Sequence, residues 1–440
     1  MKIMLLTHHY APEQGPSQRR WGALVARFTA DHEVVVLTPT PHYPSGRRMF
    51  PENLSLAPGA RRMGEYGEHI VQLPFVPHGR GLGRRTLDQF VGALCAVVAG
   101  IRWGIRPSRR PDVIIATAPA LPTAGAGYAV GWALRRPVVL EFRDAWPDLI
   151  DHGKEWDATT TSIRWHPPAR IGTLVVRYLT YLQSHCAAVV TTTESFADVL
   201  RRRGVHPVVV IRNGPKPPER IPEPAVHPHR TAGEQSGTLI SGSDAEPGQR
   251  LRRVSGPLRV VYLGTVGRAQ GLDHVVRAVA RAHDLGVTVH LRIVGSGAAE
   301  PALRLLAREL RVVVDFPGQV EQAQTRDHYD WADTAVVSLR AWKPLEWTVP
   351  SKLYELMQEG VHVTAVVGGE AADIVRMTEA GSVVAPGDVE GLARLWVTLA
   401  STGVPLPSAE RTRAWLAEHA AYDQLAQTYL RVLDSVVDRG

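Results

Sequence analysis

Short apolar runs rich in β-branched residues alternate with amphipathic stretches along the first half of the chain. Helices are predicted over Arg19–Ala30, Leu87–Trp103, Ile171–His185 and Ser195–Arg203. Strands are predicted over Ile3–Thr7, Val34–Thr38, Ile70–Leu73, Val113–Thr117, Val138–Phe142, Val189–Thr192 and Val208–Ile211. Apolar strands separated by helices are typical of a parallel sheet that is covered on both faces.

The pattern stops after Asn213-Gly214 and starts again near residue 257. The stretch between is rich in proline, serine, glycine and charged residues, so we expect a mobile linker or insert over residues 220–255. Strands are then predicted over Leu258–Leu263, Val289–Val294, Val312–Phe316, Ala335–Leu339, Val361–Val366 and Ser382–Val384, followed by a helical segment Ala409–Val437.

These elements predict an α/β chain with two doubly wound domains that face a cleft. We assign residues 1–214 to the first domain, 215–256 to the linker, 257–408 to the second domain and 409–440 to a C-terminal helical segment. In open α/β sheets, ligands bind at the carboxyl ends of the strands, so the functional residues are expected there.

The composition excludes several classes of protein. The chain has 440 residues, of which 44% are hydrophobic and 21% are charged, and it contains only two cysteines. These values exclude a wholly disordered chain, a fibre and a disulfide scaffold, and they favour a reducing, cytoplasmic setting. The longest apolar run, Phe90–Ile101, is shorter than the roughly 20 residues that cross a bilayer, so no membrane span is predicted.

The net charge of +7 comes from the first domain. Residues 1–214 carry 26 basic and 16 acidic side chains, whereas residues 257–440 carry 18 and 22. Seven arginines flank the apolar run: Arg80, Arg84, Arg85, Arg102, Arg106, Arg109 and Arg110. They indicate either contact with an anionic membrane surface or lipid diphosphate, or a buried helix whose ends are solvated by arginine. Nucleic acid is disfavoured because no aromatic-interleaved basic motif is present.

Two stretches of the first domain have the composition of a binding site. Residues 10–20 form a Pro/Gly loop that opens onto a helix, which suits an anion. Residues 140–148 end an apolar strand with Arg143, which can neutralise phosphate, and Asp144, which can accept hydrogen bonds from sugar hydroxyls. The alternative for the second stretch is a structural Arg–Asp pair that caps the strand.

Two further stretches lie in the second domain. Residues 264–271 contain three glycines and Arg268, which suit a pyrophosphate, but they match neither the dinucleotide fingerprint nor the P-loop. Pro350 is placed to begin a helix whose first turn holds Ser351 and Lys352. Glu355 lies on the same helix face as Lys352 and could bind a ribose diol. The alternative is a surface ion pair between Lys352 and Glu355.

Together these stretches resemble the retaining nucleotide-sugar glycosyltransferases of the GT-B fold, family 4, and most of all the bacterial enzymes of polysaccharide synthesis. The resemblance covers almost the whole chain outside residues 220–255. Its markers are residues 10–15 (YAPEQG), 41–46 (PHYPSG), 143–148 (RDAWPD), 211–214 (IRNG), 264–271 (GTVGRAQG), 293–297 (IVGSG) and 348–355 (TVPSKLYE).

The resemblance implies a fold and a division of roles. It implies two Rossmann-like domains, with a C-terminal helix that crosses back to the first domain, and a sugar nucleotide bound by the second domain, with a UDP-sugar favoured. By position, Gly264, Thr265, Arg268, Ser351 and Lys352 would contact the donor diphosphate. Glu355 would bind the ribose, Val320 the base, and Gly15 the donor phosphates or the acceptor. Arg143 or Asp144 occupies the region where other members place a sugar-contacting histidine.

Two departures from the family pattern affect the expected site. The first carboxylate of the family's Glu-x7-Glu pair would fall on Trp347, and Glu346 lies one residue earlier. Gln270 stands where many members have a second cation, which leaves Lys352 to neutralise the diphosphate. No Asp-x-Asp motif occurs, so no metal ion is expected, and we discount His8-His9 as a metal pair because adjacent strand residues point to opposite faces.

The resulting hypothesis is a cytoplasmic, retaining, metal-independent hexosyltransferase without a cofactor. Its acceptor would be a lipid-linked saccharide or a small secondary metabolite, as in polysaccharide or antibiotic biosynthesis. Two alternatives remain: a GT-B sugar-nucleotide epimerase or phosphorylase, and a non-catalytic binder of sugar nucleotides or polyanions. Trp347 at the position of the first carboxylate keeps the second alternative open.

Overall fold

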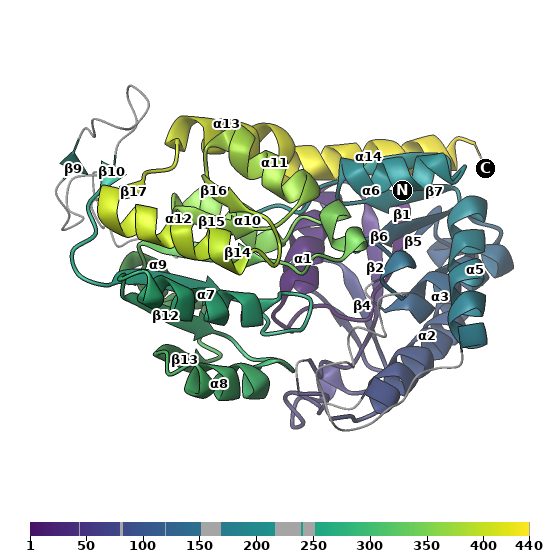
Figure 1. Cartoon of the computed structure of the whole chain (residues 1–440). Helices are drawn as coiled ribbons and strands as arrows, with labels where there is room; N and C mark the ends of the chain where they lie inside the picture. Colours follow the sequence, from purple (N-terminus) through teal and green to yellow (C-terminus); the bar gives the residue numbers. More distant parts are fainter. Residues whose placement is uncertain are drawn as a thin grey trace, which may run out of the picture. The chain divides into compact units, whose positions relative to one another are not determined.

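The computed structural model describes residues 1–43, 45–79, 82–118, 120–150, 169–215, 239–240 and 251–439 (Figure 1). Arg80 of the predicted arginine patch and most of the predicted linker lie outside the described residues. The chain divides into two compact units, of which unit 1 comprises Met1–Gly214 with His419–Gly440, and unit 2 comprises Pro215–Glu418.

Unit 1 is built around an eight-stranded sheet with the order β3-β4-β2-β1-β5-β6-β7-β8. All neighbours pair in parallel except the edge strand β3, which is antiparallel to β4. The strands are β1 (Lys2–Leu6), β2 (Glu33–Pro39), β3 (Arg61–Met63), β4 (His69–Leu73), β5 (Val113–Thr117), β6 (Val138–Phe142), β7 (Ala188–Thr191) and β8 (Val208–Val210).

Helices cover both faces of this sheet. Their bounds are α1 (Pro16–Phe28), α2 (Leu82–Gly104), α3 (Leu121–Leu134), α5 (Ala169–His185), α6 (Glu194–Arg202) and α14 (Tyr422–Val437), with short 3-10 turns η1 (Leu54–Leu56), η2 (Pro107–Arg109) and η3 (Asp148–Ile150). Helices α2 and α3 pack on one face, beside α5, whereas α1 and α14 pack together on the other (Figure 1). The C-terminal helix α14 is thus part of unit 1, and its Tyr429 packs edge-on against Trp21 and Phe28 of α1.

Unit 2 contains a six-stranded, fully parallel sheet with the order β13-β12-β11-β14-β15-β16. The strands are β11 (Leu258–Leu263), β12 (Val289–Val294), β13 (Val314–Gly318), β14 (Thr334–Ser338), β15 (Val363–Val366) and β16 (Gly381–Val384). Within the predicted linker, β9 (Leu239–Ile240) and β10 (Leu251–Arg252) form a small antiparallel sheet with β17 (Val404–Pro405).

The helices of unit 2 also lie on both faces of its sheet. Helices α7 and α12 pack on β11, β12 and each other. Helices α9, α10 and α11 contact β11, β14, β15 and β16. The bounds are α7 (Leu272–Asp284), α8 (Glu300–Glu309), α9 (Thr325–Trp331), α10 (Ser351–Glu359), α11 (Gly369–Thr378), α12 (Val389–Thr402) and α13 (Ala409–His419), with 3-10 turns η4 (Gln322–Gln324) and η5 (Lys343–Trp347). The segment expected over 409–440 is therefore divided, because α13 belongs almost wholly to unit 2 and α14 to unit 1.

Helix α2 is long and apolar enough, by length and composition alone, to cross a membrane. Within Gly83–Gly104, an 18-residue stretch has a mean hydropathy of 1.2, and 33% of that stretch is buried. A core helix of a folded domain passes the same test, and one side of α2 packs against α3, β2 and β4. Packing within unit 1 therefore accounts for the apolar run on that side of the helix.

Candidate functional site

The glycine loop of unit 2, residues 264–271, is attached by its backbone to the loop after β12. Gly264 and Val266 donate backbone hydrogen bonds to the carbonyl oxygens of Val294 and Ser296, each at 3.0 Å. Gly295 has φ +131°, and a Cβ there would lie 1.9 Å from the carbonyl oxygen of Gly264. Only glycine permits this approach, so on this side the loop is held by close backbone contact.

The end of β14 holds the other side of the glycine loop. Ser338 Oγ donates to the carbonyl oxygen of Gln270 at 2.6 Å, and Arg340 Nε donates to that of Arg268 at 2.8 Å. Arg340 also pairs with Asp273 in the first turn of α7, at 2.6 Å. Gly264, Thr265 and Arg268 therefore lie at the carboxyl ends of neighbouring strands, beside the start of α7.

The predicted base contact and the predicted helix start follow neighbouring strands of the same sheet. Val320 comes just after β13, and Gly318 at the end of that strand accepts a hydrogen bond from Gly295 at 2.7 Å. Helix α10 follows β14 and begins at Ser351, preceded by Pro350 as predicted. Every predicted donor contact in unit 2 thus follows the carboxyl end of β11, β13 or β14.

Lys352 and Glu355 form the ion pair that the sequence offered as an alternative reading. Lys352 Nζ lies 2.9 Å from Glu355 Oε2, and the ammonium is 6.0 Å from the centre of the Tyr329 ring. Glu355 is only 8% exposed, and its Oε1 accepts a hydrogen bond from Tyr329 Oη at 3.4 Å. A carboxylate can accept about four hydrogen bonds and an ammonium can donate three. The ion pair therefore does not use the whole hydrogen-bonding capacity of either side chain.

Glu346 lies in η5, against the start of α11. Its carboxylate accepts from Lys343 Nζ at 2.5 Å, and its side chain is 39% exposed. Gly369, at the first position of α11, has φ +58°, and a Cβ there would lie 2.1 Å from the carbonyl oxygen of Glu346. Trp347, at the position where the resemblance leads us to expect the first carboxylate, is half-buried.

In unit 1, the loop before α1 is held by a buried carboxylate. Glu13 Oε1 accepts from the backbone N–H groups of His42 and Tyr43 at 2.7 and 2.8 Å, and Gln18 donates to Oε2 at 2.9 Å. Burial alone would raise the pKa of Glu13, but hydrogen bonds from His9 and from these N–H groups lower it. The predicted Gly15 is the residue before α1 and has extended backbone, so it presents the start of this helix without strain.

Arg143 points to the start of α1. It donates to Ser17 Oγ, and its Nε is buried with no hydrogen-bond partner among the described residues. Burial and the nearby charge of Arg20 lower the pKa of Arg143. Asp144 is exposed. The helix start and the Arg143 guanidinium thus form a positively charged place suited to an anion.

The sequence analysis missed a buried ion pair close to Arg143, between Arg20 and Glu141. Arg20 is 1% exposed, and its NH2 lies 3.0 Å from Oε2 of the fully buried Glu141. Arg20 also donates to the carbonyl oxygens of Ile211 and Arg212, at 2.9 and 2.5 Å. A glutamate inside the otherwise apolar strand β6 was the available signal, because such a residue needs a buried cation.

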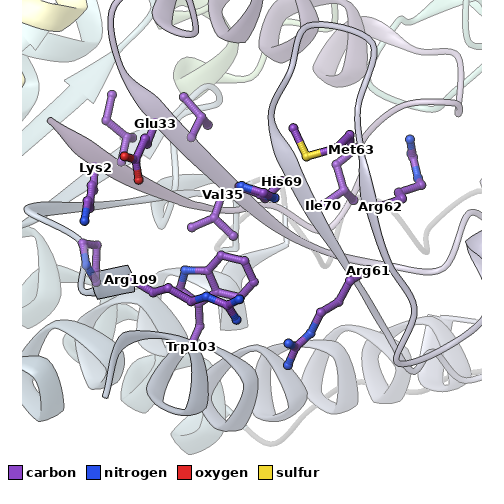
Figure 2. A pocket seen from close by; sticks show the side chains of 13 residues that line it. Lys2, Glu33, Val35, Arg61, Arg62, Met63, His69, Ile70, Trp103 and Arg109 are labelled. Carbon is purple, nitrogen blue, oxygen red and sulfur yellow. The ribbon is translucent and has the colours of Figure 1, made fainter. Parts of the chain in front are cut away.

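A cavity of about 320 Å³ opens at the opposite edge of the unit 1 sheet, at the amino ends of β1, β2 and β4 (Figure 2). Four cations, Lys2, Arg61, Arg62 and Arg109, and the carboxylate of Glu33 are among its lining residues. The Arg109 guanidinium lies over the Trp103 ring, 4.9 Å from its centre. This cavity is separate from the predicted site, which lies at the carboxyl ends of the strands.

Sequence comparison assigns each half of the chain to a glycosyltransferase family model. A model described as "Glycosyl transferase 4-like domain" matches residues 15–214, and one described as "Glycosyl transferases group 1" matches residues 257–402. No curated protein is similar enough in sequence to count as a match.

Solved structures with the same fold extend over the whole chain. Sucrose-phosphate synthase from Thermosynechococcus elongatus has a TM-score of 0.65 at 16% identity, with 100% of each chain covered. HepE from Anabaena, in complex with UDP and glucose, has a TM-score of 0.61 at 15% identity, with 99% of this chain and 100% of the other covered. The lipopolysaccharide outer core galactosyltransferase WaaB has a TM-score of 0.58 at 12% identity, with 99% of each chain covered. These likenesses establish the two-domain Rossmann-like architecture.

Proposed function

Because the chain belongs to the family-4-type glycosyltransferases of the GT-B fold, we propose that it transfers a sugar from a nucleoside-diphosphate sugar to a hydroxyl group. The observation that carries the proposal is the clustering in unit 2, where the glycine loop, Val320 and the start of α10 all follow carboxyl ends of one parallel sheet. HepE, which shares the fold, was solved with UDP and with UDP-glucose, so a UDP-hexose is the favoured donor.

The donor would be held by backbone amides and two cations. Gly264, Thr265 and Arg268 of the glycine loop would contact the diphosphate, together with Ser351 and Lys352 at the start of α10. Glu355, already fixed by Tyr329 and Lys352, would accept hydrogen bonds from the ribose diol, and backbone atoms at Val320 would contact the base.

Transfer would proceed with retention and without a divalent cation on the diphosphate. As the glycosidic bond breaks, negative charge grows on the leaving diphosphate, and Arg268, Lys352 and the helix-end amides would stabilise it. The departing phosphate would help to deprotonate the acceptor on the same face of the sugar. Glu346, Arg143 and Asp144 are the candidates for contacting the transferred sugar. Activity should therefore be the same with and without added Mg²⁺.

The acceptor would approach unit 1, in the cytoplasm at the inner face of an anionic membrane. An apolar stripe on α2, formed by Leu87, Phe90, Leu94 and Val98, is 52–66% exposed. Arg84 and Arg85 lie in the first turn of α2, where the helix dipole disfavours cations and no acidic residue compensates. An exposed apolar stripe next to cations fits the boundary between lipid headgroups and acyl chains.

Flotation with liposomes tests the membrane contact. Vesicles containing anionic lipid should carry the protein at low salt and release most of it at high salt. The double variant Phe90→Glu/Leu94→Glu should stay unbound, whereas Leu305→Glu, at an equally exposed leucine of unit 2, should float normally. Absence of wild-type flotation at low salt would end this part of the proposal.

The acceptor class remains a choice between a lipid-linked saccharide, as in polysaccharide synthesis, and a small secondary metabolite, as in antibiotic synthesis. The stripe on α2 favours the lipid-linked acceptor. Radiolabelled transfer from the preferred donor into an organic-extractable lipid fraction, compared with transfer into the water-soluble fraction, distinguishes the two.

A non-catalytic sugar-nucleotide binder is the second candidate, and the tryptophan at position 347 favours it. Incubation with a panel of sugar nucleotides, with UDP release as the readout, distinguishes the two functions. Release with at least one donor, increased by acceptor, supports the transferase. Donor binding without release supports the binder. Neither binding nor release with any donor would contradict both.

A further inference from the structure

Three buried side chains from distant parts of unit 1 converge at the carboxyl edge of its sheet. They are His8 after β1, His42 after β2 and Asp88 on α2, and they are 4%, 1% and 0% exposed. Their possible metal-ligand atoms all lie within 4.8 Å of one another. His78, from the segment after β4, brings a third imidazole to the same carboxylate oxygen.

The spacing of these atoms matches a tetrahedral zinc site. Asp88 Oδ2 lies 2.9, 3.1 and 3.6 Å from the Nε2 atoms of His8, His42 and His78. Zinc bonds to histidine nitrogen and carboxylate oxygen are about 2.0–2.1 Å long, which places the corners of a tetrahedron about 3.3 Å apart. The three distances bracket that value.

In neutral His42 and His78, the ring nitrogen that faces the Asp88 carboxylate carries a lone pair and no proton. His42 Nδ1 lies 2.8 Å from the carbonyl oxygen of Thr40, and His78 Nδ1 lies 3.1 Å from that of Gly79, so both Nδ1 atoms carry the proton. In the neutral rings, Nε2 is then an acceptor directed at Asp88. His42 Nε2 is buried, and it lies 3.1 Å from Asp88 Oδ2. One cation placed among these atoms would satisfy both rings and the carboxylate together.

The surroundings hold these groups in place. Asp88 Oδ1 accepts from the backbone N–H of Val76 at 2.8 Å, and Glu13 holds the backbone of His42. Contacts from the other ring nitrogen to backbone carbonyls are the usual outer partners of zinc-bound histidine.

We propose that His8, His42, His78 and Asp88 bind one structural Zn²⁺ ion. Three nitrogens and one oxygen suit zinc, whereas Mg²⁺ and Ca²⁺ prefer all-oxygen sites. The ion would join the ends of β1 and β2 to the segment after β4 and to α2, next to the Glu13 loop. The sequence argument discounted His8 and His9 as a metal pair, and His9 is indeed turned to Glu13, at 3.0 Å, whereas His8 meets residues from other segments. The zinc proposal does not depend on the proposed transferase activity. All four ligands belong to unit 1, and none of them is a proposed donor contact, because those belong to unit 2.

Metal analysis of the full chain, purified without a histidine tag, tests the proposal directly. We expect about one zinc per chain by elemental mass spectrometry. Metal-free protein should bind one Zn²⁺ in competition with a chromophoric chelator, and Co²⁺ in its place should give the visible absorption of a tetrahedral site. Less than about a tenth of an equivalent of zinc, together with no 1:1 binding to the metal-free protein, would overturn the proposal and assign the cluster to protonated histidines.

Single substitutions assign the ligands. His78→Gln changes the outermost ligand, which is 10% exposed, so it should fold while binding zinc at least about a hundredfold more weakly. His8→Gln should lose zinc altogether. His290→Gln, at an exposed histidine of β12, should keep the full content. Zinc retained at wild-type affinity in both ligand variants would refute the site, and the wild-type titration decides the matter if the variants fail to fold.

Discussion

The loops that precede α1 and α7 both present a helix start at the carboxyl edge of a parallel sheet, but different forces hold them. The loop before α7 is fixed mainly by backbone contacts, with Gly295 admitting the carbonyl of Gly264. The loop before α1 is fixed by buried charge, with Glu13 holding the chain at His42 and Arg20 paired to Glu141.

The difference matters for how each loop responds to change. A backbone-packed loop fails when an added atom occupies the space, and the penalty is steric. A loop held by buried charge fails when one charge loses its partner, and the penalty is desolvation, which is larger. We therefore expect the most damaging single changes in unit 1 at residues that carry no catalytic role.

The largest effect is expected from breaking the Arg20–Glu141 pair. Glu141→Gln leaves the buried guanidinium without a counter-charge, which typically lowers the free energy of unfolding by about 3–5 kcal/mol. Urea unfolding followed by circular dichroism measures the loss. Asp423→Asn, which breaks the exposed Arg27–Asp423 pair, is the control and should cost less than about 1 kcal/mol.

A double variant separates lost charge pairing from lost packing. Arg20→Met/Glu141→Leu removes both charges and should recover part of the stability that Glu141→Gln loses. If the single variant were as stable as the wild type, buried charge would not be what holds the loop before α1.

The same contrast explains what the sequence could and could not predict. Glycine spacing in residues 264–271 and Pro350 at a helix start are local signals, so the loop after β11 and the start of α10 could be predicted from the sequence. The partners of Glu13, Arg20 and Asp88 are decided by tertiary contacts, so local patterns did not reveal them. Glu141 did carry a local signal, because a charged residue inside an apolar strand indicates a buried partner. That signal does not identify the partner.

The fold was predictable to a similar depth. Apolar runs predicted all six strands of the unit 2 sheet within two residues, because the strands of a parallel sheet covered on both faces are rich in apolar residues. The edge strand β3, Arg61–Met63, was not expected, since its exposed, mostly charged sequence carries no such signal. Of the two short strands in the predicted linker, β10 pairs with β17, which is distant in the chain, and β9 pairs with β10.

The next largest effect concerns the two cations that we propose contact the donor diphosphate. Lys352→Ala and Arg268→Ala should each remove one charge-assisted contact to the diphosphate, worth roughly 1.5–3 kcal/mol, so turnover should fall at least about tenfold. Arg277→Ala, at an exposed arginine of α7, is the control and should act like the wild type. Near-normal turnover in both site variants would place the donor elsewhere.

A steric test of the glycine loop comes third. Gly295→Ala adds a Cβ 1.9 Å from the carbonyl oxygen of Gly264, so it should displace the loop and weaken UDP binding. Gly286→Ala is matched for left-handed backbone, with φ +87°, but has nothing within 4 Å of the added atom. We expect Gly295→Ala to be less stable than the control by about 1–3 kcal/mol, and equal losses would show that the backbone contact is unimportant.

The last expected effect is a pH dependence of stability that comes from a buried histidine of unit 2. His362, the residue before β15, is 3% exposed, and its ring lies within hydrogen-bond distance of the hydroxyl groups of Thr334 and Ser382. Burial together with the charge of Arg252 lowers its pKa to about 3. The ring is then neutral in the folded chain at pH values where the unfolded chain, with a pKa of 6.5, binds a proton. Between pH 6.5 and pH 3 the unfolded state therefore binds more protons than the folded state. The contribution of this histidine to the free energy of unfolding is full above pH 6.5 and is lost as the pH falls towards 3, by at most about 1.4 kcal/mol per pH unit.

Urea unfolding between pH 7 and pH 4.5 measures this slope. His362→Gln removes the titrating group and should flatten the dependence by about one proton, even if it also lowers stability at pH 7. His290→Gln, at an exposed site in the same sheet, should leave the slope unchanged. Because the slope reports proton uptake alone, it separates titration from packing, and an unchanged slope in His362→Gln would mean that other groups cause the loss of stability in acid.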